Sequence, residues 1–170
     1  AKETILARFD EKRGCFTTAL FHQQVWGITP RNPEQYLALN LLMDPEISIV
    51  SLMGKAGTGK TLLALAAGLQ MMLVESQYHK LLVSRPVFPM GRDLGYLPGD
   101  LQEKLAPWMQ PIFDNLELLI GSPSHAGTNS TKGYHELLEQ ELLVIEPLTY
   151  IRGRSIPNQF LIVDEAQNLT

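Results

Sequence analysis

The sequence predicts an α/β fold with a mostly parallel sheet, and three observations support that prediction. Apolar runs typical of buried strands occur at 47–53, 80–84 and 160–163. Each run ends at a glycine-containing loop or at charged side chains. The segments between the runs include stretches with helical spacing. Because strands that alternate with helices are typical of parallel sheets, we expect three layers, with helices on both faces of the sheet.

The N-terminal residues 1–30 are expected to form an appendage, and residues 31–170 a single core. Short strands are predicted at Thr4–Phe9 and Phe16–Phe21, around a charged turn. A break follows, after which helical spacing resumes over Glu34–Met43.

Asn32 is the expected N-cap of this helix, and Pro33 its first residue. The remaining elements are predicted from the same signals. They are a helix over 62–73, a strand over 80–84, a long loop over 85–100, a helix over 101–119 broken at Pro107 and Pro111, a stretch without periodicity over 121–133, a short helix over 134–140, and strands over 142–145 and 149–151.

The phosphate-binding pattern G-x-x-x-x-G-K-[ST] is matched by Gly54-Lys55-Ala56-Gly57-Thr58-Gly59-Lys60-Thr61. The match lies between a predicted strand and a predicted helix, as the pattern requires. Glycines let the backbone curl so that its N–H groups face phosphate oxygens, and the new helix adds its positive end. Lys60 is expected to reach the β- and γ-phosphates, and the Thr61 hydroxyl to bind Mg²⁺. The loop, with Leu62 directly after it, predicts a nucleoside triphosphate site.

A second motif, Asp164-Glu165, follows the apolar run at 160–163. Such a run is typical of a central strand covered on both faces. Ligands of these sheets bind beyond the carboxyl ends of the strands, so Asp164 is assigned to the Mg²⁺ shell. Glu165 would orient or deprotonate the attacking water, an effect worth about 10²–10⁴ in rate. The alternative is that the pair merely opens the next helix; the phosphate loop upstream favours hydrolysis.

Composition limits the other possibilities. The chain has 170 residues, of which 45% are hydrophobic, enough for one globular core. No apolar run reaches the length of a membrane span, and the N-terminus lacks a secretory pattern. The one cysteine, Cys15, allows no intrachain disulfide, so we expect a cytoplasmic protein without a membrane partner. The four histidines lack metal-ligand spacing, and each is expected to be a surface or packing residue.

The net charge of −4 does not suggest a protein that binds nucleic acid mainly through electrostatics. A local basic strip is still compatible with it. Four arginines fall in loops near the predicted active-site edge and are candidates for RNA contacts or for an arginine finger. They are Arg85, Arg92, Arg152 and Arg154, and any one of them is equally well explained as a surface charge.

Two short motifs resemble those of superfamily 1 helicases. Asp164-Glu165-Ala166-Gln167 is similar to their motif II, and Asn32-Pro33-Glu34-Gln35 to the motif that reads adenine. Gln35 suits that task because one amide offers the donor and the acceptor that match the adenine edge. The alternative for Gln35 is an exposed helix residue. The N-K-x-D and D-x-x-G patterns of GTPases are missing from the sequence.

The connecting segments narrow the resemblance. The sequences VSRPV, GYLPGD, PWMQP and YIRGR resemble the PhoH-like ATPase family, and the likeness extends over roughly Gly27–Thr170. The resemblance implies a RecA-like core, often assembled in rings and sometimes fused behind a PIN ribonuclease domain. The segment 27–42 most resembles that of the family members fused to a PIN domain.

The resemblance also implies residue roles. Gly54–Thr61 would bind the phosphates, and Thr61 with Asp164 would hold Mg²⁺. Glu165 would activate water, and Gln167 would couple the γ-phosphate to the next strand. Arg152 and Arg154 occupy the R-G-R loop of the family. An arginine there would act as a finger on a neighbouring subunit, worth about 10³–10⁵ in rate, or grip a nucleic-acid backbone.

The family's sensor segment, which would read like Gly-Asp-x-x-Gln, does not occur in the sequence. We therefore expect the core to be incomplete after the strand at 160–163 and the chain to be part of a longer protein. Nucleotide binding is expected to survive in this chain, whereas turnover depends on the missing segment.

Two functions follow. The first is an ATPase that couples hydrolysis to RNA binding or remodelling, with helicase activity as one form of it. The second is an ATP-dependent regulatory or assembly module without motor activity, for example one that gates an attached nuclease. A homo-oligomer is expected in either case. A small-molecule kinase is disfavoured because Glu165 has no role in it.

Overall fold

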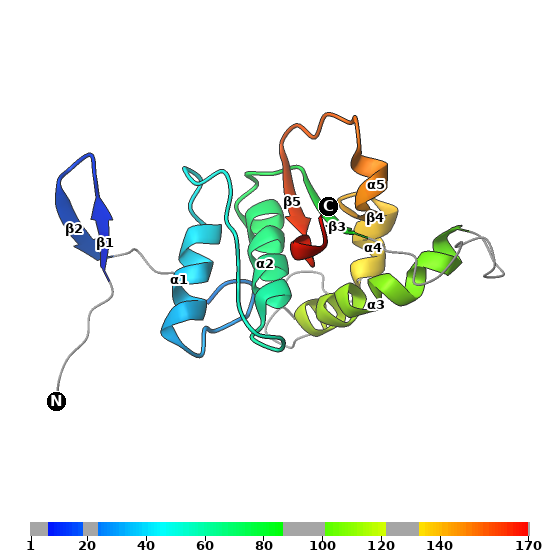
Figure 1. The fold of residues 1–170 in the computed structure, drawn as a ribbon, viewed down its shortest axis with the longest axis horizontal. Helices are drawn as coiled ribbons and strands as arrows, with labels where there is room; N and C mark the ends of the chain where they lie inside the picture. Colours follow the sequence, from blue (N-terminus) through cyan, green and yellow to red (C-terminus); the bar gives the residue numbers. More distant parts are fainter. Residues whose placement is uncertain (1–6, 19–23, 87–100, 122–132, 170) are drawn as a thin grey trace.

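The computed structural model describes residues 7–18, 24–86, 101–121 and 133–169 (Figure 1). The predicted loop beyond Pro86, with Arg92, and most of the stretch over 121–133 lie outside these residues. The elements are β1 (Ala7–Asp10), β2 (Cys15–Thr18), α1 (Pro33–Leu42), α2 (Lys60–Leu69), the π-helical turn η1 (Gln70–Val74), β3 (Lys80–Arg85), α3 (Leu101–Ile120), α4 (Tyr134–Glu139), β4 (Leu143–Pro147), α5 (Leu148–Ile151), β5 (Gln159–Val163) and the 3₁₀ turn η4 (Ala166–Asn168).

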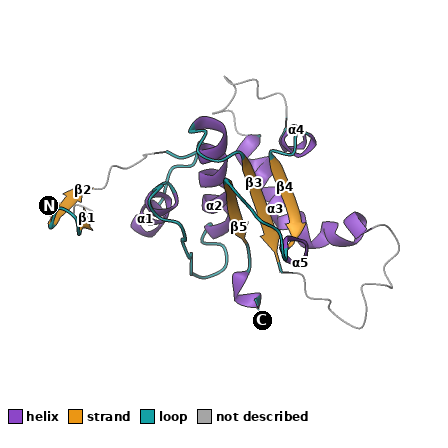
Figure 2. Ribbon diagram, turned by 90° about the horizontal axis from the view of Figure 1, so that it is seen from above, coloured by secondary structure: helices purple, strands orange, loops and turns teal. Residues whose placement is uncertain are grey.

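A three-stranded parallel sheet forms the centre of the molecule, with the strand order β4-β3-β5. Figure 2 shows the three strands side by side, with α1 and α2 to one side of them. Ser84 of β3 is level with Glu146 of β4 and with Val163 of β5. The carboxyl ends of all three strands therefore meet at one edge. The predicted α/β class with a parallel sheet is confirmed.

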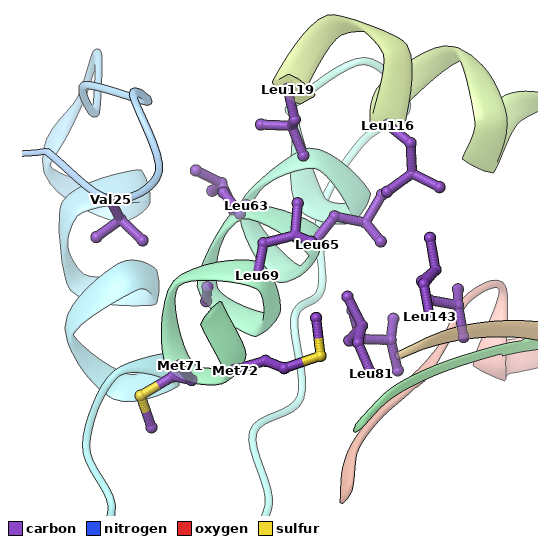
Figure 3. Close-up of a cluster of buried hydrophobic side chains, with 14 of the residues drawn as sticks. Val25, Leu63, Leu65, Leu69, Met71, Met72, Leu81, Leu116, Leu119 and Leu143 are labelled. Atoms are coloured by element: carbon purple, nitrogen blue, oxygen red, sulfur yellow. The ribbon is translucent and has the colours of Figure 1, made fainter. Parts of the chain in front are cut away.

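Helix α2 packs against the sheet and supplies much of the core. Its residues Leu65 and Leu69 are fully buried, as are Leu81 of β3 and Leu116 of α3 (Figure 3). Burying one such side chain contributes about 1.5–3 kcal/mol to folding. This burial fixes α2 against β3, and with it the position of the phosphate loop that precedes the helix.

Helix α1 begins as the sequence predicts. Asn32 has extended backbone angles, and its side-chain Oδ1 accepts a 2.8 Å hydrogen bond from the Gln35 N–H. Pro33 follows at the first helical position, where its missing N–H costs nothing. The cap thus holds Gln35 in the first turn of α1, facing the phosphate loop.

The predicted strand at 47–53 is wrong. The segment contains no strand, and Ile49 and Met53 are 87% and 91% exposed. A strand needs a neighbour to pair its backbone groups, and no described residue outside the segment forms a ladder with it. The apolar residues of the segment favour burial, but no described residue pairs with the segment as a strand.

Three other local predictions need correction. Residues 149–151 were expected to form a strand but belong to α5. Helix α3 runs unbroken through Pro107 and Pro111, although an internal proline costs about 3 kcal/mol. Burial of its Met109, Ile112, Leu116 and Leu119 on one face explains this continuity. β5 lies at the edge of the described sheet instead of its centre, and its Leu161 is 41% exposed.

The predicted N-terminal strands form an antiparallel hairpin of β1 and β2, which Figure 1 shows beside α1 and away from the sheet. Its Phe9 and Phe16 rings contact each other edge to face, with centroids 5.3 Å apart. The division into an appendage and a core remains a prediction. None of the helices in the described parts of the chain has the length and hydropathy needed to cross a membrane.

Candidate nucleotide site

The phosphate loop connects the segment 47–53 to the first turn of α2. Gly57 and Gly59 have φ values of 75° and 84°, in the left-handed region that favours glycine. The Lys60 ammonium donates to the carbonyls of Gly54 and Lys55, at 3.0 and 2.9 Å. The Thr58 hydroxyl donates to the same Lys55 carbonyl, at 2.9 Å. Through these contacts the loop closes around its own lysine.

The rest of the loop is open to solvent. Residues 54–58 are exposed, which includes Lys55 and Ala56, whereas Gly59 and Lys60 are half-buried. Leu62 is half-buried as well and packs against the core, so its side chain anchors the helix below the loop. The first backbone N–H groups of a helix have no partner within it, so those at the start of α2 suit an anion.

The loop and the carboxylate motif meet at the carboxyl edge of the sheet. The Thr61 hydroxyl donates a 2.8 Å hydrogen bond to Oδ1 of Asp164, which is 103 residues away in the chain. The Asp164 N–H donates to the Ser84 carbonyl at 2.8 Å, which extends the ladder between β3 and β5 by one residue. The Asp164 side chain is 14% exposed. This pairing joins α2 to β5 at the site.

Glu165 directly follows Asp164 and begins the turn η4. Its φ of 52° is left-handed, a strained conformation for a residue with a side chain. Its Oε2 accepts a short hydrogen bond from Nε2 of Gln167, and its side chain is 41% exposed. The strained turn directs the carboxylate back toward the edge of the sheet that carries Asp164.

Gln35 contacts the loop from α1. Its Nε2 donates to the Thr58 carbonyl at 3.2 Å, and its Oε1 accepts from the Arg31 N–H at 2.8 Å. A Cβ on Gly59 would lie 3.5 Å from the same Nε2, an ordinary contact. The amide therefore lies beside the phosphate loop, with its donor and its acceptor held by backbone groups.

A shallow depression of about 300 Å³ adjoins this position. Its lining comprises Pro30, Arg31, Asn32, Pro33 and Tyr36. Of these residues, the sequence predicted a role only for Asn32 and Pro33, as the cap and the first residue of the helix and as part of the motif that resembles the adenine-reading one. Tyr36, which directly follows Gln35 in α1, was missed by the sequence analysis. An aromatic residue next to the amide predicted to read the base could have indicated it.

The four candidate arginines have different environments. Arg85 points toward Asp164 and Glu165 and is 20% exposed. Arg154 forms a 2.6 Å ion pair with Glu146. Arg152 follows α5 and is exposed, and Arg92 lies outside the described residues. The structure therefore places Arg85 beside the carboxylates of Asp164 and Glu165, and pairs Arg154 with a glutamate near the end of β4.

A parallel sheet whose carboxyl edge carries a phosphate loop and a hydroxyl–carboxylate pair defines a phosphate-loop NTPase. A family model described as "PhoH-like protein" matches residues 27–170. The chain belongs to the PhoH-like family of phosphate-loop NTPases.

Relatives with this family name share much of the sequence. "Protein PhoH2" of Bacillus subtilis (strain 168) is 54% identical over 148 residues, which are 87% of this chain and 32% of that protein. "Protein PhoH2" of Mycolicibacterium smegmatis is 47% identical over 148 residues, or 86% and 32% of the two chains. "Protein PhoH" of Escherichia coli (strain K12) is 34% identical over 143 residues, or 84% and 38%. The chain thus spans about a third of the length of these relatives.

Proposed function

We propose that the chain binds ATP with Mg²⁺ and forms the hydrolytic site of an ATPase. The observation that carries this proposal is the 2.8 Å hydrogen bond from Thr61 to Asp164. It joins the phosphate loop to the carboxylate strand, the two parts that a phosphate-loop hydrolase must bring together. The matching family is one of phosphate-loop NTPases, which agrees with the proposal.

The residues present fit Mg²⁺. A hydroxyl and a carboxylate meet at Thr61 and Asp164, and oxygen atoms are the ligands that this ion prefers. Among the residues with described positions, no three His, Cys, Asp or Glu side chains gather into a metal site. That suits an ion held by one or two protein oxygens together with substrate phosphates. When bound, the ion neutralises phosphate charge.

The side chains of the site divide the remaining work. Lys60 would exchange its two carbonyl contacts for phosphate oxygens, a stronger charge-assisted interaction. Glu165 would orient the attacking water and accept its proton. Gln35 would exchange its contacts with the Thr58 carbonyl and the Arg31 N–H for the adenine edge. The depression around Tyr36 lies next to it.

ATP hydrolysis by the full-length protein tests this proposal directly. Glu165→Gln should still bind ATP but hydrolyse it about 10²–10⁴-fold more slowly. The control is a filter or calorimetric assay showing unchanged ATP affinity. Turnover at the parent rate in Glu165→Gln would remove Glu165 from its proposed role.

We also propose that hydrolysis is coupled to RNA, in a homo-oligomer. The helicase-like motifs and the exposed Arg152 favour this coupling. The engagement of Arg85 and Arg154 by carboxylates favours the alternative, an ATP-dependent regulatory or assembly module. The discriminating experiment measures ATPase rates with and without single-stranded RNA at low and moderate salt, since phosphate contacts weaken steeply as salt rises. Stimulation supports RNA coupling, and a rate that ignores RNA supports the module.

A further inference from the structure

Arg85 is the last residue of β3, and its guanidinium faces the carboxylate motif of its own chain. Nη1 lies 4.0 Å from Oδ2 of Asp164, and Nη2 lies 3.6 Å from Oε1 of Glu165. The parallel register explains this position: Ser84 is level with Val163, so the next residues, Arg85 and Asp164, are level as well. With 20% of its side chain exposed, Arg85 is largely covered.

A third contact fixes the guanidinium. Nη1 donates a 3.2 Å hydrogen bond to the Trp108 carbonyl of α3. The guanidinium is planar and its donors point in fixed directions, so partners on two different elements determine where it lies. Arg85 thereby connects the end of β3, the motif after β5 and the helix α3.

The guanidinium of Arg85 lies beside two negative charges, the carboxylates of Asp164 and Glu165. Asp164 and Glu165 are adjacent carboxylates whose side chains are 14% and 41% exposed, so solvent screens the charge of Asp164 less than that of Glu165. Glu165 is held from two directions, by Gln167 at Oε2 and by Arg85 at Oε1. Loss of Arg85 would remove the cation and leave the Glu165 carboxylate with a single described partner.

We propose that Arg85 is a positioning residue of the hydrolytic site and acts within its own chain. It balances the charge of the two carboxylates and holds Glu165 in the orientation from which it activates water. This inference rests on the proposed ATPase function. It also assigns Arg85 a role different from those considered from the sequence, a finger on a neighbouring subunit or an RNA contact.

The first test compares Arg85→Met and Arg85→Lys in the full-length protein with Mg²⁺ and ATP. Arg85→Met should lower kcat about 10–100-fold, a range typical of residues that orient a catalytic ligand, with KM unchanged. Arg85→Lys should recover part of the loss, because the charge returns without the planar fork. Lys80→Met is the matched control: Lys80 lies at the opposite end of β3, in a 3.6 Å ion pair with Glu141. Its kcat should equal that of the parent.

Thermal melting and nucleotide affinity separate positioning from a structural role. A folded Arg85→Met that binds nucleotide normally but hydrolyses it slowly supports the proposal. Arg85→Met with a lower melting temperature and a parental kcat would overturn it. If Arg85→Met does not fold, the same comparison is made with Arg85→Lys, for which a parental kcat would overturn the proposal.

A double-mutant cycle tests whether Arg85 acts through Glu165. In the Glu165→Gln background, Arg85→Met should cause no further loss of kcat. Independent, multiplying losses would overturn the proposed route. A slow Glu165→Gln with a fully active Arg85→Met would refute this inference alone, whereas a full-length parent protein that hydrolyses no ATP would refute the proposed function as well.

A mixing experiment distinguishes action within the chain from action on a neighbour. Arg85→Met and Glu165→Gln proteins are mixed after dissociation and reassembly, and their ATPase rate is compared with the mean of the two separate rates. No gain is expected, because each chain needs both of its own residues. Recovered activity would show Arg85 acting on another subunit and overturn the proposal.

Discussion

At the residue scale, the Lys60 ammonium binds to backbone carbonyls of the phosphate loop itself. It donates to two loop carbonyls, and no carboxylate lies among its hydrogen-bond partners in the described residues. Carbonyl oxygens carry only partial charge, so the anionic oxygens of a triphosphate are the better acceptors. We therefore propose that the lysine exchanges these contacts for phosphate oxygens when nucleotide binds.

We predict that Lys60→Ala weakens ATP binding by about 1.5–3 kcal/mol, the value of a hydrogen bond to a charged group. Isothermal calorimetry on the 170-residue chain measures this change. Lys80→Ala is the control, since Lys80 pairs with Glu141 at the far end of β3. Equal ATP affinities in parent and Lys60→Ala would contradict the assignment of the loop.

We predict that Gln35→Leu reduces the preference for ATP over GTP, since Leu cannot offer a donor and an acceptor to the adenine edge. The expected loss is about 0.5–1.5 kcal/mol for each hydrogen bond. Competition binding with ATP and GTP measures it. Gln110→Leu is the control, because its amide bonds to Asp114 on α3. An unchanged preference would leave Gln35 as a residue that supports the loop.

At the element scale, α2 and β3 approach closely at Gly68. A Cβ there would lie 2.6 Å from Cδ1 of Leu81 and 3.1 Å from Cδ1 of Phe160. Leu81 is fully buried and has little room to move. The glycine therefore permits the close approach of α2, which follows the phosphate loop, to β3, which ends at Arg85, and to β5, which Asp164 follows.

We predict that Gly68→Leu lowers the free energy of unfolding by about 1–3 kcal/mol through overpacking. Gly68→Ala should cost less, because it adds only one carbon and gains about 1 kcal/mol of helix propensity. Urea denaturation followed by circular dichroism gives both values. A Gly68→Leu protein as stable as the parent would show that the helix can move away from the sheet without loss.

At the scale of the whole molecule, large apolar side chains are exposed in β5 and in the segment before the phosphate loop. β5 pairs only with β3 among the described strands, and its Leu161 is 41% exposed. Ile49, in the segment before the phosphate loop, is 87% exposed. Exposed apolar side chains favour association with other chains, and so does a strand edge without a partner among the described strands.

We predict that the 170-residue chain binds a hydrophobic dye and self-associates at high concentration, and that Ile49→Lys combined with Leu161→Lys reduces both. Sedimentation velocity and dye fluorescence report these properties. Leu118→Lys is the control, because Leu118 is 60% exposed and belongs to α3, outside both β5 and the segment 47–53. A parent chain that stays monomeric and binds no dye would contradict this prediction.

Much of the fold could be predicted because its signals are local. The cap at Asn32 depends on neighbouring residues only, as does the start of α2 after the glycines of the loop. The strands at 80–85 and 159–163 follow from short apolar runs. The errors arose where contacts with distant segments decide the outcome. The segment 47–53 has no paired strand among the described residues, and α3 continues through its prolines because its apolar face is buried.

The sequence by itself determined the class of protein, because the phosphate-loop pattern and the carboxylate motif are contiguous runs whose chemistry depends on residue type and spacing. Only the tertiary structure decided how these parts meet. The bond from Thr61 to Asp164 spans 103 residues, and Arg85 reaches the carboxylates through the register of β3 with β5. Register and packing depend on contacts between distant segments, so no local pattern could assign Arg85 to its own site.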